Sequence, residues 1–365
     1  MRIVITGGGT GGHVFPAIAV ADELRASGPS ADILYVGTRG GIEERAATSA
    51  GLDFRPISAA GWAGVSAYRK ALAALKLLFG FVQAFGVLAR FKPDVVLGTG
   101  GYVSVPVVAA AAVLRIPTVI HEQNRYPGLA NRILSRFVQH VVTTYEDDTG
   151  SFPAAKCTLS GMPLRKDIVE QIGTRVSPAQ FELDPSKCTI FLLGGSQGAH
   201  SLNLAMIEAM NVLDTDRYQV LFMTGKNDLE MVRERSEHCP VQAYVAPFFD
   251  DIAQAYAASD LVICRAGAGT LAELTAFGLP AILVPYPYAA GGHQEANSRV
   301  MVEAGAAKMV LDSDLDGKKL AGLIQELAGD RSLLESMRSK SRSLARPHAA
   351  RDIVDMLRRA AARRK

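Results

Sequence analysis

Short runs of consecutive apolar residues recur along the whole chain, separated by longer stretches in which polar residues are interspersed. Uninterrupted runs rich in Val, Ile and Leu are typical of parallel strands that are covered on both faces of a sheet. We therefore predict strands at 2–6, 33–36, 95–98, 118–121 and 141–143, and again at 190–193, 220–223, 242–245, 261–264, 281–284 and 308–311. Strands that alternate with helical stretches predict a doubly wound α/β fold.

The length of 365 residues suggests two such domains, at about 100–200 residues each. We place the junction near Gly161-Met162-Pro163, so that the first domain covers 1–162 and the second 163–340. The last stretch, 332–365, is predicted to be helical and ends in RRAAARRK, and its final part, 341–365, follows the second domain. Two interpretations of it remain open: a solvated, fraying terminus, or a helix that packs back on the first domain with its basic end near anionic lipid.

Composition narrows the class of protein. The net charge of +3, from 39 basic and 36 acidic residues, is too small to indicate nucleic-acid binding. The four cysteines are far apart, without the close spacing of a metal or redox site, and we expect reduced thiols in a cytoplasmic protein. The first residues lead directly into a predicted strand, and nothing there marks the chain for export.

Two similar glycine-rich turns stand in the two halves of the chain. TGGGTGGH (6–13) follows the first predicted strand, and GGSQGAH (194–200) follows the strand at 190–193. A strand, a glycine turn and a helix start together point backbone N–H groups at an anion, usually a phosphate. The first turn also matches G-x-G-x-x-G, but the second strand ends in Val36-Gly37-Thr38-Arg39, without the acid that a dinucleotide site expects. An NADP site using Arg39 therefore stays open as an alternative.

Polar side chains gather after several other strands. His13 opens the first helix and can act as a general base or simply cap and pack. A third glycine turn, 98–101, opens another helix, and His121-Glu122-Gln123-Asn124 follows the next strand, where it either binds a polyol or caps the following helix. Both lie at the strand ends where ligand sites of α/β proteins collect.

The second half adds two candidate segments. In Arg265-Ala266-Gly267-Ala268-Gly269-Thr270, small residues let backbone amides approach a diphosphate, and Glu273 can accept hydrogen bonds from ribose hydroxyls. Thr270 and Glu273 equally fit a capping box, Thr-x-x-Glu. Gln294 and Asn297, after Gly291-Gly292, either face a ligand from one side of a helix or belong to an ordinary solvated helix start.

One stretch, 68–92, is largely apolar with a polar residue every seven positions, at Arg69, Lys76, Gln83 and Arg90. It is either a crossover helix buried on the sheet or a basic amphipathic surface for a bilayer interface. Asp312-Ser313-Asp314 has metal-like spacing but lies in a polar segment, and we interpret it as a solvated turn, which leaves no predicted metal site and no cofactor.

Taken together, GGGTGGHVFP, GTGGYVSVP, HEQN, GGSQGAHSLN, RAGAGTLAE, GLPAILVPYP and HQEANS occur in one order along the chain. In this ordered set the sequence resembles the MurG family of UDP-N-acetylglucosamine transferases. The resemblance implies an α/β GT-B fold, with two Rossmann-like doubly wound domains separated by a cleft. It implies an inverting, metal-independent transfer of GlcNAc from UDP-GlcNAc to the 4-hydroxyl of undecaprenyl-pyrophosphoryl-MurNAc-pentapeptide (lipid I), giving lipid II in peptidoglycan and cell-wall synthesis. It also implies peripheral attachment to the anionic cytoplasmic face of the inner membrane.

The resemblance also assigns site residues. His13 matches the proposed base, and Thr10, Gly11 and Gly12 match the turn that faces the donor. Asn124 and Gln294 match contacts to GlcNAc, whereas Arg165 and Ser196 match contacts near the diphosphate. Phe249 matches the position whose backbone reads the uracil. The helix start formed by Ala268, Gly269, Thr270, Leu271, Ala272 and Glu273 matches the part that holds diphosphate and ribose. The remaining alternative is a non-catalytic nucleotide-sugar binding module of the same fold.

Overall fold

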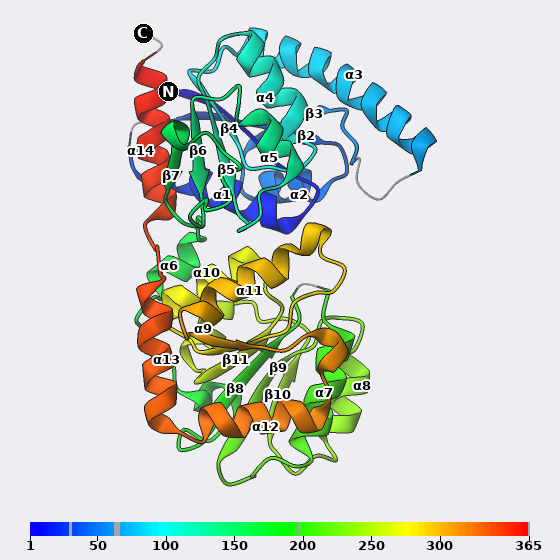
Figure 1. Ribbon diagram of the computed structural model, residues 1–365, viewed down its shortest axis with the longest axis vertical. Coiled ribbons are helices and arrows are strands. Elements are labelled where there is room, and N and C mark those ends of the chain that lie inside the picture. The colour runs from blue at the N-terminus through cyan, green and yellow to red at the C-terminus, as the bar shows by residue number, and fades with distance from the viewer. Residues whose placement is uncertain (29–30, 62–65, 196, 364–365) are drawn as a thin grey trace. The chain divides into compact units, whose positions relative to one another are not determined.

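The computed structural model describes residues 1–28, 31–61, 66–195 and 197–363, and it divides into two compact units. The first unit comprises 1–166 together with 346–365, and the second comprises 167–345. The division thus comes a few residues after the predicted junction. Each unit has a parallel sheet with helices on both of its faces (Figure 1).

Within the described residues, the first unit contains a seven-stranded sheet in the order β3-β2-β1-β4-β5-β6-β7, with every pair parallel. Its strands are β1 (Arg2–Thr6), β2 (Asp32–Thr38), β3 (Asp53–Ile57), β4 (Val95–Gly98), β5 (Thr118–Glu122), β6 (His140–Thr143) and β7 (Cys157–Leu159). Its helices are α1 (Gly11–Ala26), α2 (Ile42–Ser49), α3 (Ala67–Phe91), α4 (Ser104–Val113), α5 (Leu129–Leu134) and α14 (Ala349–Ala362). The order reverses direction beside β1, which is where α/β proteins place their ligand sites.

The second unit, in its described part, has a six-stranded parallel sheet in the order β10-β9-β8-β11-β12-β13. The strands are β8 (Cys188–Leu193), β9 (Tyr218–Met223), β10 (Ala243–Ala246), β11 (Leu261–Cys264), β12 (Ala281–Leu283) and β13 (Ala307–Met309). The main helices are α6 (Lys166–Glu170), α7 (His200–Met210), α8 (Leu229–Ser236), α9 (Ile252–Ala257), α10 (Ala268–Phe277), α11 (His293–Glu303), α12 (Gly317–Ala328) and α13 (Arg331–Ser343).

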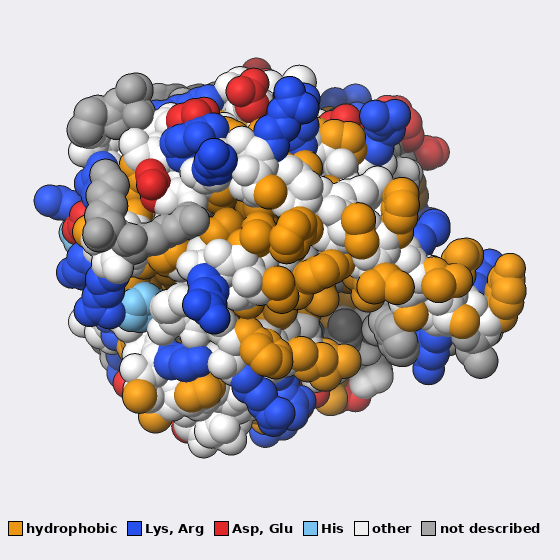
Figure 2. Space-filling model, turned by 90° about the horizontal axis from the view of Figure 1, so that it is seen from above, with side chains coloured by type: hydrophobic (Ala, Val, Ile, Leu, Met, Phe, Trp, Pro, Cys, Tyr) orange, Lys and Arg blue, Asp and Glu red, His pale blue; other side chains and the backbone are white. Residues whose placement is uncertain are grey.

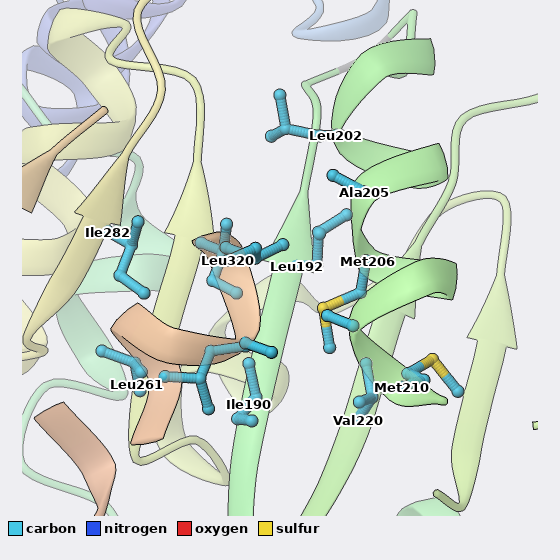
Figure 3. Packing of buried hydrophobic residues seen from close by; sticks show 14 of the residues in the cluster. Ile190, Leu192, Leu202, Ala205, Met206, Met210, Val220, Leu261, Ile282 and Leu320 are labelled. Atoms are coloured by element: carbon cyan, nitrogen blue, oxygen red, sulfur yellow. The ribbon is translucent and has the colours of Figure 1, made fainter. Parts of the chain in front are cut away.

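The continuous apolar runs are explained by burial on both sides of each sheet, because successive side chains of a strand point to opposite faces. Ile190 and Leu192 of β8 pack with Leu202 and Met206 of α7 in one core (Figure 3), whereas Phe191 stacks edge-on against Tyr256 of α9. In β1, Ile3 and Ile5 likewise join one cluster and Val4 another. A strand that is buried on both faces therefore reads as a nearly continuous apolar run, without regular alternation of polar and apolar residues.

The predicted terminal helix is two helices, α13 and α14, with Pro347 between them. Ile353, Val354 and Leu357 of α14 are fully buried in the cluster that contains Ile3, Ile5 and residues of α1. A solvated, fraying terminus is therefore the wrong interpretation of this segment. α14 completes the first unit because it covers one face of that unit's sheet.

Helix α3 is a crossover helix, but it is only partly covered. Ala73, Ala84 and Leu88 are buried, and a Cβ on Gly80 would lie 1.9 Å from the Ser58 carbonyl oxygen, so the helix docks closely along one narrow strip. Gln83, placed in the polar stripe by the sequence pattern, accepts a hydrogen bond from the Ser58 N–H at 2.7 Å. The prediction of a helix buried on the sheet is therefore wrong for most of the apolar residues of α3.

Candidate functional site

The first glycine-rich turn joins β1 to α1, and its backbone is braced by a side chain that the sequence did not single out. Glu43 of α2 is buried, and its carboxylate accepts hydrogen bonds from the N–H groups of Gly9 at 3.3 Å and Thr38 at 3.1 Å. Burial and then the Glu43 charge raise the pKa of the neighbouring Tyr102. The turn thus already holds a carboxylate of the protein, and a pyrophosphate at the same place would be repelled. This geometry disfavours the NADP alternative.

His13 lies three residues into α1, after Thr10 at the N-cap and the helical Gly11 and Gly12. Its Nδ1 lies 3.1 Å from the Thr99 carbonyl oxygen and 3.0 Å from Oε1 of Gln123. The third glycine turn lies against the imidazole of His13, because a Cβ on Gly100, whose φ is +97°, would lie 3.0 Å from the Nδ1 atom of His13. The sequence-predicted turns at 6–13 and 98–101 therefore meet around one histidine.

The segment after β5 is organised by Glu122, whose buried carboxylate accepts four hydrogen bonds. Oε1 binds the backbone N–H and the side-chain amide of Asn124, at 3.0 and 3.3 Å, and Oε2 binds Gly128 N–H at 3.1 Å and Nδ2 of Asn131 at 2.9 Å. Asn124 itself is half-buried at the start of this loop. These hydrogen bonds support the structural interpretation of the segment, since Glu122 stabilises the loop before α5, whereas polyol binding by Asn124 stays a prediction.

In the second unit, the turn between β8 and α7 borders a pocket of about 630 Å³. Small-molecule sites are typically clefts of about 300–1,000 Å³. A Cβ on Gly198, whose φ is +77°, would lie 2.3 Å from the Thr224 carbonyl oxygen, so only glycine allows this turn to close. The pocket is lined by Leu193, Gly194, Gly195, Gln197, Gly198, Ala199, His200, Ser201, Arg265, Gly267, Thr270, Tyr286, Pro287, Tyr288, Gln294 and Asp312.

Arg265 and Asp312 form an ion pair in this pocket, with Nη1 2.5 Å from Oδ1. Ser201 completes the group, because its hydroxyl donates to Asp312 at 2.8 Å and accepts from Arg265 at 3.0 Å. The guanidinium also donates to the carbonyls of Val284 and Pro285. The interpretation of the segment at 312–314 as a solvated turn is wrong for Asp312, whose carboxylate lines the pocket although it is remote in sequence from the glycine turn.

The side-chain carbonyl oxygen of Gln294 is hydrogen-bonded within the protein: Oε1 accepts from the N–H groups of Ala266 at 3.0 Å and Tyr286 at 2.9 Å. In this orientation the amide NH₂ group is the hydrogen-bond donor that Gln294 can offer to a ligand in the pocket that it lines. Asn297 is fully buried and contacts the Ala266 carbonyl, so it does not line the pocket with Gln294.

The capping box predicted for Thr270 and Glu273 is wrong. The N-cap of α10 is Gly267, which has no side-chain capping bond, and Thr270 is the third residue of the helix. Thr270 lines the pocket instead, and Glu273, on the second helical turn, accepts a hydrogen bond from Tyr256 Oη at 2.9 Å. Of the other predicted members of this helix start, Ala268 and Leu271 are buried, whereas Gly269 and Ala272 are half-buried.

Three other residues were predicted for the site, namely Phe249, Arg165 and Ser196. The Phe249 ring packs edge-on against Phe181 and Phe191, with centroids 5.6 and 5.5 Å away. Arg165 is half-buried at the end of the first stretch of the first unit. Ser196 lies outside the described residues.

The described part of the chain offers few groups for metal or thiol chemistry. No group of three or more His, Cys, Asp or Glu side chains there is arranged to hold a metal ion. The four cysteines are free thiols; Cys264 is buried, and burial raises its pKa well above the ordinary value, with a smaller contribution from the Glu273 charge. The thiols therefore offer no nucleophile beside the pocket.

One described helix, Tyr68–Phe91 within α3, is long and apolar enough to cross a membrane, by length and composition alone. Its exposed side chains include Leu75, Leu78, Phe79 and Val82, each about 60% exposed. Figure 2 shows hydrophobic side chains gathered on the face viewed there, with Lys and Arg side chains beside them. This surface is apolar to an unusual degree for a soluble domain.

Comparison with known proteins gives a consistent result. Models of the glycosyltransferase family 28 N-terminal and C-terminal domains match residues 3–143 and 189–355. The chain is 40% identical over 373 residues to a protein of Pelobacter propionicus and 42% identical over 362 residues to one of Geotalea uraniireducens. Both are named UDP-N-acetylglucosamine–N-acetylmuramyl-(pentapeptide) pyrophosphoryl-undecaprenol N-acetylglucosamine transferase, and the alignments cover 97–98% of this chain and 98% of each relative.

Among solved structures, the crystal structure of MurG from Acinetobacter baumannii is 31% identical, with a TM-score of 0.82. The match covers 98% of this chain and 99% of that one. The predicted GT-B class, with two doubly wound α/β domains, is confirmed. The chain belongs to glycosyltransferase family 28, through both its N-terminal and its C-terminal domain.

Proposed function

We propose that this protein is a hexosyltransferase that moves GlcNAc from UDP-GlcNAc to lipid-linked MurNAc-pentapeptide in peptidoglycan synthesis. The observation that carries the proposal is identity of 40–42% over nearly the whole chain to transferases named for this reaction. The alternative of a non-catalytic binding module is disfavoured, since relatives that match nearly the whole chain are named as transferases. An NADP oxidoreductase is disfavoured by Glu43 at the first glycine turn.

The donor is assigned to the pocket of the second unit. Its volume of about 630 Å³ suits a sugar nucleotide, and the helices α7 and α10 both begin at it. Backbone N–H groups and the positive ends of these helices stabilise a diphosphate. Thr270 and the Gln294 NH₂ group supply hydrogen bonds to the phosphate and the sugar. By their positions in the family motifs, Glu273 is assigned to the ribose, the Phe249 backbone to the uracil, and Arg165 and Ser196 to the diphosphate.

The acceptor chemistry is assigned to the first unit, with His13 as general base. In a single displacement, the acceptor 4-hydroxyl oxygen bonds to the anomeric carbon as the bond from that carbon to the UDP oxygen breaks, which inverts the configuration. His13 takes the hydroxyl proton, and UDP leaves with the electron pair of the broken bond. Helix N-termini, backbone amides and Arg165 stabilise the departing diphosphate in place of a cation. Asn124 and the turn at Thr10, Gly11 and Gly12 contact the sugars.

The exposed side of α3 is assigned to the membrane surface, where a polyprenyl-linked acceptor resides. Leu75, Leu78, Phe79 and Val82 are exposed on this helix. Arg69, Lys70 and Lys76 lie on the same helix, and a basic residue near an anionic surface contributes about 1 kcal/mol. An amphipathic helix with such composition rests in the bilayer interface rather than crossing it. The enzyme is then peripheral, on the face where UDP-GlcNAc is available.

The test is turnover. Purified protein is incubated with UDP-GlcNAc and a short-chain lipid I analogue in EDTA, and the disaccharide product is detected by mass spectrometry. We expect stoichiometric product and UDP. UDP release without the disaccharide, or tight binding of NADP in place of UDP, would refute the proposed function.

A further inference from the structure

The side chains behind His13 form a hydrogen-bonded chain whose donor and acceptor pattern permits one arrangement of protons. Resting on the proposed function, in which His13 is the base, we propose that Gln123 and His121 are positioning residues. They hold His13 in the tautomer that carries its proton on Nδ1, so that the Nε2 lone pair is left for the acceptor hydroxyl.

The hydrogen-bonded chain begins at His121, which is 1% exposed. Its Nε2 lies 3.0 Å from the carbonyl oxygen of Gly161, which only accepts hydrogen bonds, so Nε2 carries the proton. The Thr144 hydroxyl is the more distant neighbour of the same nitrogen, at 3.5 Å. Burial lowers the pKa of His121 to about 4, so the ring is neutral near pH 7 and its Nδ1 presents a lone pair.

That lone pair fixes the amide of Gln123, which is 2% exposed. One end of the amide lies 3.0 Å from His121 Nδ1 and 2.7 Å from the Thr99 carbonyl oxygen. Both neighbours are acceptors, so this end is the NH₂ group, and a flipped amide would place oxygen against two acceptors. The carbonyl Oε1 of Gln123 is thereby directed at His13.

His13 completes the chain because its Nδ1 faces two acceptors, Gln123 Oε1 at 3.0 Å and the Thr99 carbonyl at 3.1 Å. Nδ1 therefore donates, and Nε2 of the neutral ring is the proton acceptor. Thr99 is itself anchored, since its N–H binds the Thr6 carbonyl at 2.8 Å and its hydroxyl binds the His13 carbonyl at 2.7 Å. A histidine held in the wrong tautomer loses most of its value as a base.

A neutral amide in this position orients the ring without the negative charge that a carboxylate would add. The charged and titratable groups of the surrounding elements are His121 and Glu122 of β5, and Glu43 and Tyr102 near the glycine turns. Glu122 is committed to Asn124, Gly128 and Asn131. Replacing Gln123 by a carboxylate would therefore add a charge directly at His13 Nδ1 and would stabilise the imidazolium.

Two variants of Gln123 test the proposal in the transfer assay over a range of pH. Gln123→Met keeps the volume but removes the hydrogen bonds of the amide to His13, His121 and Thr99. Since the Thr99 carbonyl still accepts from His13, we expect kcat to fall about 10–100-fold, with the Kd for UDP unchanged. Gln123→Glu should move the acid limb of the kcat/KM profile to higher pH. Gln139→Met is the matched control, because the Gln139 amide oxygen binds Thr118 elsewhere in the same unit.

His121 supplies a rescue test. In His121→Asn the side-chain oxygen can accept from the Gln123 NH₂ group in place of Nδ1, whereas in His121→Leu nothing can. We expect kcat of His121→Asn to lie between those of wild type and His121→Leu, while the Kd for UDP stays constant across the series.

Absence of transfer by the wild-type protein would refute the proposed function and this inference with it. With an active wild type, a kcat of Gln123→Met equal to that of Gln139→Met would overturn the inference alone. An acid limb of Gln123→Glu that coincides with that of wild type would also overturn it. So would equal losses in the two His121 variants that track their melting temperatures, because the residues would then act through stability.

Discussion

Replacing Glu273 by alanine separates a structural carboxylate from one that binds ribose. In the structure Glu273 does not cap α10, because Gly267 occupies the N-cap, and its carboxylate accepts a 2.9 Å hydrogen bond from Tyr256. A hydrogen bond to a charged group contributes about 1.5–3 kcal/mol. For a unit of 150–250 residues, each kcal/mol changes Tm by about 2–4 °C. We therefore expect Glu273→Ala to lower Tm by several degrees.

The effect of Glu273→Ala on the binding of UDP should be larger than its effect on stability. If Glu273 accepts hydrogen bonds from both ribose hydroxyls, losing them costs about 3 kcal/mol or more, which is about a 10²-fold increase in Kd for UDP. Calorimetric titration with UDP measures this directly. Tyr256→Phe is the matched control, since it removes the same hydrogen bond within the protein while keeping the carboxylate. We expect its Tm to fall similarly and its Kd for UDP to stay near that of wild type.

The reasoning fails if Glu273→Ala and Tyr256→Phe lower Tm alike and both bind UDP as wild type does. Glu273 would then contribute to the stability of the second unit and not to ribose binding. Glu273→Gln refines the result, because the amide keeps an acceptor for Tyr256 but weakens the pair of bonds to the ribose. Its Kd should fall between those of wild type and the alanine variant.

Four further outcomes are expected. His13→Ala should lower kcat about 10²–10⁴-fold while UDP-GlcNAc still binds, and near-normal turnover would remove His13 from the mechanism. Activity should persist in EDTA, and restoration by Mg²⁺ of an activity lost in EDTA would contradict metal independence. Replacing Leu78 and Phe79 by serine should weaken binding to anionic vesicles without changing UDP affinity. Val212→Ser, at a similarly exposed apolar residue of the second unit, should leave vesicle binding unchanged. A sharp fall in Tm with unaltered vesicle binding would point to another membrane contact. The pKa of His121 is lowered to about 4 in the folded protein, whereas in the unfolded chain it is about 6.5. As pH falls below about 6.5, the unfolded chain therefore binds a proton at this residue before the folded protein does, which favours unfolding. Stability should therefore decline from pH 6.5 toward 4 more steeply in wild type than in His121→Asn, and parallel denaturation curves against pH would contradict this.

The sequence by itself determined the class of fold and the buried strands. Strands such as β1, β4 and β11 have the predicted bounds, because burial on both faces requires an uninterrupted apolar run. The two strands that escaped prediction, β3 and β7, lie at the two edges of the first sheet. In β3 the sequence DFRPI alternates polar with apolar residues and contains Pro56, which an edge strand tolerates. Such a strand has no pattern that distinguishes it from a loop.

The sequence also determined where the glycine-rich turns lie, because a glycine turn between a strand and a helix is a local feature. Helix α3 shows the limit of that information, since its composition fits both a buried and an exposed helix. Only the packed structure decided that Gly80 and Ala84 face the domain and that Leu78 and Phe79 face outward. The physical reason is that periodicity reveals which residues share a face but not which face is covered.

The partners of the site residues were decided by tertiary structure alone. Glu43 reaches the first glycine turn from another helix, and Asp312 reaches Arg265 from a segment about 50 residues later in the chain. Gln123 and His121, two residues apart, acquire their roles only because the Thr99 and Gly161 carbonyls lie beside them. Hydrogen bonds and ion pairs act over about 3 Å in space, and the distance along the chain between the partners carries no information about them. The sequence therefore named the groups that can do chemistry, and the fold determined which of them are oriented to do it.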